Sequence, residues 1–400
     1  MDRTRHAVNI DEIEQAARRY LPGFLFDFIA GGVDGEAGLD RNRQAFARHR
    51  LVPRYLRDVS RRSLATRILG RDYAMPLGIS PTGPAQLFRR DADRMLARAA
   101  READIPFILS GAAGASLEEI ARIAPDHGWF QLYPARDRAI TRDQIRRAAD
   151  AGTPALVLTV DTPVTPKRER HLRNRISVPF RPGPALWPRL AKEVLLHPEW
   201  FLRFLLGGGM ETMGNWAPYA PKGAGASDVA AFFFDQAFVP GDSGTLCWRD
   251  LETCRALWPG PLGVKGILHP EDARRAASLG ADAILVSNHG GKALDAAPAA
   301  LDMLPAIRRA VGPDYPLFLD SGVRRGSDVV IALCLGADFV FAGRPTLYGT
   351  AAGAEAGARK ALAILRQETD LVMAGIGCVS PAELGADCLA GGAGNEEATS

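Results

Sequence analysis

Short apolar runs of strand length recur along the chain from residue 77 to residue 342, and stretches with helical periodicity separate them. The runs are rich in β-branched and aliphatic residues, which is typical of strands buried on both faces. They predict eight strands, at 77–80, 106–109, 129–132, 155–160, 262–265, 283–287, 316–319 and 338–342, with helices between them at 91–103, 116–124, 141–151, 270–279, 302–310 and 327–335. Repeated strand–helix alternation predicts an α/β fold, a TIM (β/α)8 barrel. An open doubly wound sheet is the alternative, although nothing resembles the Gly-x-Gly-x-x-Gly turn of a dinucleotide-binding sheet.

The residues before the first barrel strand predict a helical extension. Residues 8–30 carry an amphipathic helix that Asn9 or Asp11 can cap, a break at 21–23, and a short apolar helix with a glycine stop. Residues 40–72 are rich in arginine and contain a proline, and we expect an irregular segment there.

One connection between strands is much longer than the others. Strand four ends near Thr159 and strand five begins near Leu262, so a long loop follows strand four, with an insertion at about 177–245. Loops of this length are usually functional or partly disordered. Residues 184–213 within it are apolar and aromatic with interleaved basic side chains, which is typical of a helix at a membrane surface. A helix that packs on its own barrel or on a neighbouring subunit has the same composition, so both interpretations stay open.

Composition narrows the class of protein. The 400 residues fit a single domain at 1–384 and a polar tail at 385–400, for which we expect disorder. A net charge of +3 is too small to predict a nucleic-acid partner. Five scattered cysteines without metal-ligand spacing predict no metal site and a reducing, cytoplasmic compartment. The charged N-terminus predicts no signal peptide, and no apolar run has the length of a membrane span.

Polar groups and glycines follow the predicted strands, where a barrel places its active site. In chain order they are Pro81, Thr82, Gly83, Ser110, Gln131, Tyr133, Thr159, Asp161, Lys265, Ser287, His289, Asp320, Gly322, Arg324, Gly343 and Arg344. Neutral polar side chains suit the edge of a heteroaromatic ring. Glycines and arginines after strands seven and eight suit a phosphate, because backbone N–H groups and guanidinium groups bind one there. The sequence therefore predicts a flavin or pyridoxal nucleotide at the barrel mouth.

Four of these side chains can carry chemistry. His289 fits a general base, because the pKa of histidine lies near working pH. Asp161 can orient the histidine, and Tyr133 can hydrogen-bond a substrate oxygen. Lys265 fits either a Schiff-base nucleophile, as in an aldolase barrel, or a fixed cation that stabilises negative charge on a reduced ring.

The motifs around these residues, at 130–133, 158–163, 264–266, 287–291 and 320–326, together resemble those of the FMN-dependent L-2-hydroxy-acid oxidase and dehydrogenase family. The resemblance covers about residues 10–384. It implies an FMN-binding TIM barrel, a small 2-hydroxy acid as substrate and a homo-oligomer, a tetramer. The catalytic residues implied are His289 as base, Asp161 as its partner, Lys265 beside the flavin and Tyr133 at the substrate hydroxyl, with Arg168 beside the substrate. The flavin contacts implied are Pro81, Thr82, Gly83, Ser110, Gln131, Thr159, Lys265 and Ser287 for the ring, and Asp320, Gly322, Arg324, Gly343 and Arg344 for the ribityl chain and phosphate.

Three positions depart from this family's pattern: Ser321 stands where the family usually has glycine, and two further departures concern the substrate. Phe28 stands where the family usually has tyrosine, and Lys292 stands where it usually has arginine. Both positions normally hold the substrate carboxylate; lysine loses the bidentate fork and phenylalanine loses a hydrogen bond. With Ala112 giving a roomier apolar wall, we expect a bulky or aromatic 2-hydroxy acid and poor activity on glycolate and lactate. A related alcohol or amine substrate is the alternative.

The same comparison predicts how electrons leave. Gly83 stands where oxidases of the family usually carry alanine, and residues 183–215 resemble the membrane-binding segment of the mandelate dehydrogenase type. We therefore expect a dehydrogenase at the cytoplasmic face of the inner membrane that passes electrons to a membrane quinone. The third hypothesis is a barrel that has lost its enzymatic activity and serves only as a scaffold at the membrane surface. The altered carboxylate site prompts it.

Overall fold

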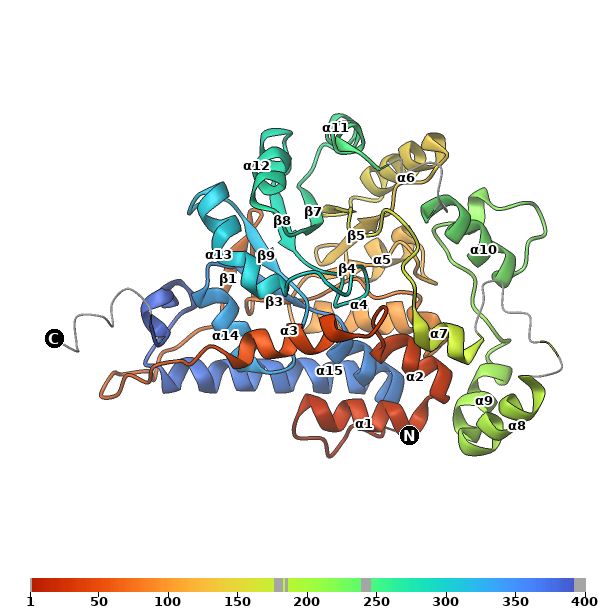
Figure 1. Cartoon of the computed structure of the whole chain (residues 1–400), viewed down its shortest axis with the longest axis horizontal. Helices are drawn as coiled ribbons and strands as arrows, with labels where there is room; N and C mark the ends of the chain where they lie inside the picture. The colour runs from red at the N-terminus through yellow and green to blue at the C-terminus, as the bar shows by residue number, and fades with distance from the viewer. Residues whose placement is uncertain (1, 176–182, 184–185, 239–245, 392–400) are drawn as a thin grey trace.

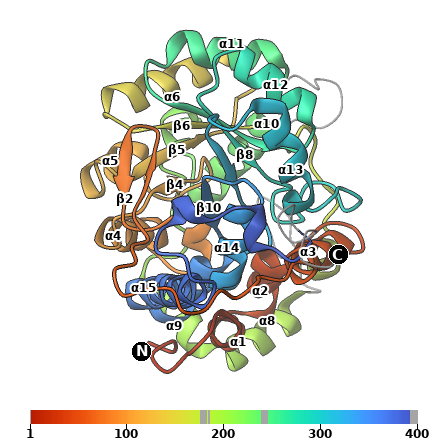
Figure 2. The same ribbon diagram turned by 90° about the vertical axis from the view of Figure 1, so that its left-hand side faces the viewer.

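The computed structural model describes residues 2–175, 183, 186–238 and 246–391. Its centre is a closed barrel of eight parallel strands in the order β10-β3-β4-β5-β6-β7-β8-β9 (Figures 1 and 2). The strands are β3 (Leu77–Ile79), β4 (Phe107–Leu109), β5 (Gly128–Leu132), β6 (Leu156–Thr159), β7 (Leu262–Ile267), β8 (Ala283–Val286), β9 (Leu317–Leu319) and β10 (Phe339–Ala342). Each strand overlaps its expected range, so the predicted barrel is confirmed and the open sheet is wrong.

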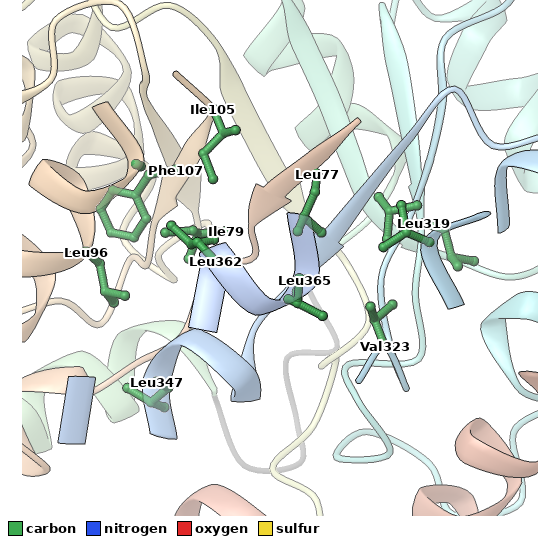
Figure 3. Close-up of a cluster of buried hydrophobic side chains, with 14 of the residues drawn as sticks. Leu77, Ile79, Leu96, Ile105, Phe107, Leu319, Val323, Leu347, Leu362 and Leu365 are labelled. Carbon is green, nitrogen blue, oxygen red and sulfur yellow. The ribbon is translucent and has the colours of Figure 1, made fainter. Parts of the chain in front are cut away.

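Two apolar layers hold the barrel, because successive strand residues face opposite sides. Trp129 of β5 contacts Phe318 of β9 and Phe341 of β10, at ring-centroid distances of 6.3 and 5.7 Å. β5 is not a neighbour of β9 or β10, so the Trp129 ring meets the other two across the barrel interior. The other layer lies between strands and helices, where Leu77 and Ile79 lie near Leu362 and Leu365 (Figure 3).

The outer helices follow the strands in the predicted alternation. They are α4 (Ala92–Glu102), α5 (Leu117–Ile123), α6 (Arg138–Asp150), α12 (Pro270–Ser278), α13 (Ala300–Val311) and α14 (Gly326–Cys334). The long α15 (Arg344–Gly375) was not predicted, and non-helical backbone at Ala354 interrupts it. It runs beneath the barrel and supports α1, α4 and α14 (Figure 1).

The N-terminal extension is confirmed as two helices, α1 (Ile10–Tyr20) and α2 (Gly23–Ala30). Asn9 caps α1 by accepting a hydrogen bond from the Glu12 N–H at 2.8 Å. The apolar face of α1, which includes Ile13 and Tyr20, is buried and packs against α15.

The prediction of an irregular segment at residues 40–72 is wrong at both ends. Residues 37–47 form α3 (Ala37–Ala47), and β1 (Thr66–Ile68) pairs with β2 (Arg71–Tyr73) as an antiparallel hairpin. Ile68 and Tyr73 are buried, and the Tyr73 ring lies 6.0 Å from that of Phe339, at the start of β10. The hairpin thus closes the amino-terminal end of the barrel, a tertiary role that arginine-rich local composition concealed.

The long loop after β6 contains five α-helices and a short 3-10 helix (Ala217–Tyr219) within the described ranges. The α-helices are α7 (Glu169–Asn174), α8 (Trp187–Leu196), α9 (Pro198–Leu206), α10 (Ala226–Ala237) and α11 (Trp248–Leu257). Residues 177–182, 184–185 and 239–245 of the predicted insertion lie outside those ranges. Figure 1 shows α8 and α9 as a pair beside α2, away from the barrel strands.

The expected disorder of residues 385–400 is wrong for its first part. A short 3-10 helix spans Ala386–Cys388, and Leu389 forms a β-bridge with Leu51. Cys388 and Leu389 are buried, so this segment belongs to the fold and the boundary at 384 is too early. Residues 392–400 lie outside the described part of the chain. Within that part, none of the helices is both long and apolar enough to cross a membrane.

Candidate active site

A histidine–aspartate pair stands at the carboxyl ends of β8 and β6. His289 Nδ1 lies 2.7 Å from Asp161 Oδ1. A carboxylate only accepts hydrogen bonds, so this contact assigns the proton to Nδ1 and leaves Nε2 with a free lone pair. Burial alone would raise the pKa of Asp161, but the charges of His289 and Lys265 outweigh it and lower that pKa. Asp161 is therefore an anion that fixes the histidine tautomer.

Lys265, near the carboxyl end of β7, joins this pair to a second carboxylate. Its Nζ donates to Ser287 Oγ at 2.8 Å and lies 3.6 Å from Asp161 Oδ2 and 3.4 Å from Asp320 Oδ2. Burial opposes its charge, but Asp320 and Asp161 overcome that effect and raise the pKa of Lys265. The lysine is a permanently charged, buried cation.

Close backbone contacts let these side chains meet. Gly266, which follows Lys265, has a φ of 106°, and a Cβ there would lie 2.5 Å from the Asp161 Cβ. His289 has a φ of 58°, an uncommon conformation for a non-glycine residue. The side chain of Ser287, two residues earlier, accepts from the His289 N–H at 3.0 Å and supports that turn.

Two supports of the His289 loop were not predicted. Asn42 of α3 and Asn288 exchange amide hydrogen bonds of 2.9 and 2.7 Å. Ser321 Oγ accepts from the backbone N–H groups of Asn288 and Gly290 and donates to Asp320 Oδ1. Ser321 occupies a position where the family usually has glycine. The sequence showed this substitution, but it did not show the hydrogen bonds that the serine hydroxyl makes.

Neutral polar groups line up along the ends of β3, β4, β5 and β6, as predicted. Gln131 Nε2 donates to Thr159 Oγ1 at 2.8 Å, and Gln131 Oε1 accepts from the Gly111 N–H. A Cβ at Gly83 would lie 2.4 Å from Ser110 Oγ, so this turn packs tightly. Thr82 Oγ1 is buried without a partner in the described part of the chain. An unpaired buried hydroxyl beside a cavity is expected where a ligand supplies the missing hydrogen bond.

A pocket opens in front of these strand ends and contains both ends of the predicted cofactor site. Its lining includes Ser80, Pro81, Thr82, Gly83, Lys265, His289, Asp320, Gly322, Arg324, Gly343 and Arg344. Ser80, which was not predicted, donates to Asp320 Oδ2 at 2.7 Å and holds that carboxylate in place. The buried pair of Gln131 and Thr159 continues the polar edge, because Thr159 lies in register with Lys265.

The two arginines at the predicted phosphate end of the pocket differ in their hydrogen-bond partners. Arg324 Nε is buried without a partner among the described residues, which leaves it for a ligand. The guanidinium of Arg344 instead donates to the carbonyl oxygens of Ile29, Gly290 and Gly31. Arg344 therefore ties α2 to the β8 loop, and what it offers a phosphate is the backbone N–H at the start of α15.

Of the predicted substrate residues, Phe28 and Lys292 line the pocket and, with Arg168 beside the Phe28 ring, form its outer wall. The Phe28 ring stacks on that of His171 at 4.7 Å, and Lys292 Nζ and the Arg168 guanidinium lie 5.5 and 5.8 Å from its centroid. Lys292 Nζ donates to the Phe28 carbonyl oxygen at 2.7 Å. His171 was not predicted as a site residue. The sequence signal was its place three residues after Arg168.

The basic side chains of this wall lack anionic partners in the described part of the chain. Within the described ranges, neither Lys292 nor Arg168 has a carboxylate partner, and Arg168 Nε is buried without any partner. Burial, then the charges of Arg344 and Arg168, hold the pKa of Lys292 well below its ordinary value. Burial and the charge of Arg168 lower the pKa of His171 to about 3, so this ring is neutral. Such a wall favours an anionic ligand.

Tyr133 lies at the end of β5 and belongs to an aromatic cluster with Phe233 and Phe238. Burial, then the charge of Asp161, raise the pKa of Tyr133 to about 12. The phenol thus keeps its proton and serves as a hydrogen-bond donor.

A barrel with an oriented histidine–aspartate pair, a buried cation and a pocket lined by polar strand ends, glycines and arginines is typical of a nucleotide-dependent oxidoreductase. The unpaired Thr82 and Arg324, at opposite ends, fit the polar ring and the phosphate of FMN. The family model of the FMN-dependent dehydrogenases matches residues 17–391. The chain belongs to this family, and FMN is its cofactor.

Known relatives cover nearly the whole chain. An L-lactate dehydrogenase of Pseudomonas aeruginosa is 39% identical over 374 residues, which is 94% of this chain and 96% of the relative. The crystal structure of a monotopic membrane protein, (S)-mandelate dehydrogenase, matches with a TM-score of 0.90 at 38% identity, covering 96% of this chain and 100% of the other. A soluble mutant of the membrane-associated (S)-mandelate dehydrogenase from Pseudomonas putida matches with a TM-score of 0.81 at 36% identity, covering 96% and 99%.

Proposed function

We propose that the protein oxidises a 2-hydroxy acid with a bulky, apolar side chain to the 2-keto acid. The single observation that carries the chemistry is the His289–Asp161 pair, 2.7 Å apart, with charged Lys265 beside it. When bound, FMN supplies the two-electron oxidant. The protein's side chains bind the acid, move its proton and set the electrostatics of the pocket.

His289 is the proposed base. Its Nε2 takes the proton of the substrate hydroxyl, and Asp161 stabilises the imidazolium that results. Tyr133 donates a hydrogen bond to the same substrate oxygen, which its raised pKa permits. Lys265 keeps its charge throughout and favours negative charge that develops at the polar ring edge. The proposed cofactor contacts are those predicted from the sequence, with Arg344 acting through its backbone.

Lys292 and Arg168 are the proposed binders of the substrate carboxylate, because they are the cations of the wall that lack a carboxylate partner in the described structure. The Phe28 ring lies near both cations and offers no hydrogen bond, so a small acid is held less firmly here. Its ring and Ala112 favour an apolar substrate side chain, which gains binding by burial at about 25 cal/mol per Å².

The alternative of a Schiff-base lyase at Lys265 is disfavoured. A nucleophilic lysine must lose its proton. Here two carboxylates lie within 3.6 Å of Lys265 Nζ, and they raise its pKa.

We also propose that α8 and α9 attach the protein to the membrane surface, and that a quinone takes the electrons. Trp200 is buried and donates to the Phe88 carbonyl oxygen at 3.1 Å, so one face of the pair packs on its own barrel. The other face exposes Leu195, Leu205 and Leu206, at 80, 69 and 80%. The likeness to a solved structure described as a monotopic membrane protein, with a TM-score of 0.90, supports attachment to a membrane surface. The site at the cytoplasmic face of the inner membrane and the tetramer remain predictions.

The test is anaerobic addition of a bulky 2-hydroxy acid to the FMN-loaded protein. The yellow absorbance of the cofactor should bleach, and one keto acid should form per flavin. If FMN binds but no hydroxy acid, alcohol or amine bleaches it, the proposed activity is wrong.

A further inference from the structure

A second, apolar cavity lies outside the barrel mouth and has no part in the chemistry above. Its volume is about 300 Å³, and its walls come from α2, the segment after β3, α8, α9, the segment that follows α9, and α10. The aromatic lining includes Phe24, Phe28, Trp200, Phe204 and Phe234. An apolar cavity of about 150 Å³ can hold benzene, so this one has room for a substituted ring.

Three polar side chains border the cavity: Gln86, Glu211 and Ser227. Glu211 is already engaged by Arg94 at 2.5 Å, and Ser227 lies at the start of α10. Gln86 differs, because it is only 6% exposed and its Oε1 is buried without a partner among the residues that the structure describes. Its amide nitrogen likewise has no hydrogen-bond partner within the described ranges. A buried amide in an apolar cavity is costly unless a ligand completes its hydrogen bonds.

The position of the cavity links two surfaces. Phe28 lines both this cavity and the flavin pocket, so the two share a wall one side chain thick. On the other side Trp200 and Phe204 of α9 form the wall, while Leu202, Leu205 and Leu206 of the same helix are exposed at 58, 69 and 80%. A ligand in the cavity would therefore lie between the apolar outer surface and the redox site.

We propose that this cavity binds the electron acceptor, a lipophilic quinone, with the Gln86 amide donating a hydrogen bond to one quinone carbonyl. The proposal rests on the oxidation proposed above. The hydroxy acid loses two electrons and two protons as it becomes the keto acid, and the quinone gains the same number as it becomes the quinol. An alkyl chain alone fits the apolar walls but leaves Gln86 unpaired. A quinone carbonyl can accept from Gln86 Nε2, and the hydroxyl of the quinol that forms can donate to Gln86 Oε1.

Binding can be measured without turnover. The FMN-loaded protein, with no hydroxy acid present, is dialysed to equilibrium against decyl-benzoquinone. Gln86→Met removes the amide at nearly constant volume and should weaken binding about tenfold, as loss of a hydrogen bond predicts. Ala226→Trp, at the half-buried start of α10, should fill part of the cavity and weaken binding further. Ala231→Trp is the matched control, because it lies on the same helix but does not line the cavity.

Kinetics separate this proposal from the proposed function. In both cavity variants the substrate should still bleach the flavin at the wild-type rate, whereas reoxidation by the quinone should slow about tenfold. Equal quinone binding in Gln86→Met, Ala226→Trp and wild type would overturn the site. Unchanged quinone binding with weaker binding of long-chain hydroxy acids would assign the cavity to the substrate side chain instead. Failure of any hydroxy acid to bleach the flavin would contradict the proposed function, while the dialysis still decides the site.

Discussion

The barrel mouth and the outer wall of the pocket differ in how their charged side chains are paired. At the mouth, Lys265 lies near two carboxylates and His289 is hydrogen-bonded to Asp161. On the wall, Lys292 and Arg168 have no carboxylate partner among the described residues and lie 5.5 and 5.8 Å from the centroid of the Phe28 ring. The charges of the mouth are paired without substrate, whereas in the proposed function the substrate's carboxylate pairs with the cations of the wall.

This difference separates chemistry from selectivity. A preorganised network needs no rearrangement at the moment of reaction, so damage to it should reduce the rate itself. The wall instead contributes binding free energy that depends on which acid is bound. Changes there should redistribute activity among substrates without abolishing it.

The sharpest contrast is between two histidines, one in each region. His289→Gln should lower the rate of anaerobic flavin reduction by about 10²–10⁴-fold, the usual contribution of a general base. His171→Gln removes the ring stacked on Phe28 and should change substrate affinity while leaving that rate within about threefold, because the ring holds no reacting proton. Stopped-flow absorbance gives both quantities. Equal losses of rate in the two variants would contradict the assignment of chemistry to the mouth and of substrate binding to the wall.

The exposed leucines of α9 test whether membrane attachment is separate from the chemistry at the barrel mouth. Leu205→Ser combined with Leu206→Ser should reduce binding to lipid vesicles by about tenfold per residue, since burying a leucine contributes roughly 1.5–3 kcal/mol. Flavin reduction by substrate should not change. Leu371→Ser, an exposed leucine on α15, is the matched control and should leave vesicle binding intact. Sedimentation with vesicles measures the effect, and equal binding by all three proteins would refute attachment through α9.

The wall itself can be altered toward small acids. Phe28→Tyr with Lys292→Arg supplies a hydroxyl and a bidentate fork, so kcat/KM for lactate should rise at least about tenfold, as one added charged hydrogen bond predicts. Lys222→Arg, at an exposed lysine, is the control. If lactate turnover is unchanged in the double variant, these two positions do not bind the carboxylate.

The lowered pKa of Lys292 predicts a smaller, pH-dependent effect. An anion beside the amine raises its pKa, so the complex holds more protons than the free site, and affinity increases as pH falls through the window between the two pKa values. Binding of the keto-acid product should take up as much as one proton within that window. Titration calorimetry in buffers of different ionisation enthalpy measures it. The uptake should vanish in Lys292→Arg, and persistence there would assign the proton to another group.

The mouth was predictable from sequence because its residues sit at strand ends. The register of the barrel brings Thr159 beside Lys265, and His289 and Asp161 come directly after their strands. Local patterns therefore sufficed to place the base, its partner and the cation together. The family resemblance added the roles and the cofactor.

The wall and its supports were less predictable because they depend on contacts between distant segments. Asn42 reaches Asn288 from a helix that composition had marked as irregular, and the Arg344 guanidinium is taken by carbonyl groups of α2 and the β8 loop. The stack of His171 on Phe28 joins segments that lie 143 residues apart in sequence. No local periodicity reports such contacts.

The most direct test of the division between mouth and wall is an anaerobic stopped-flow screen of flavin reduction. The series should include glycolate, lactate, mandelate and long-chain 2-hydroxy acids. Similar limiting rates with much lower dissociation constants for the bulky acids are predicted, because the mouth is common to all and the wall discriminates by apolar burial. Glycolate or lactate as the best substrate, judged by the ratio of rate to dissociation constant, would contradict it.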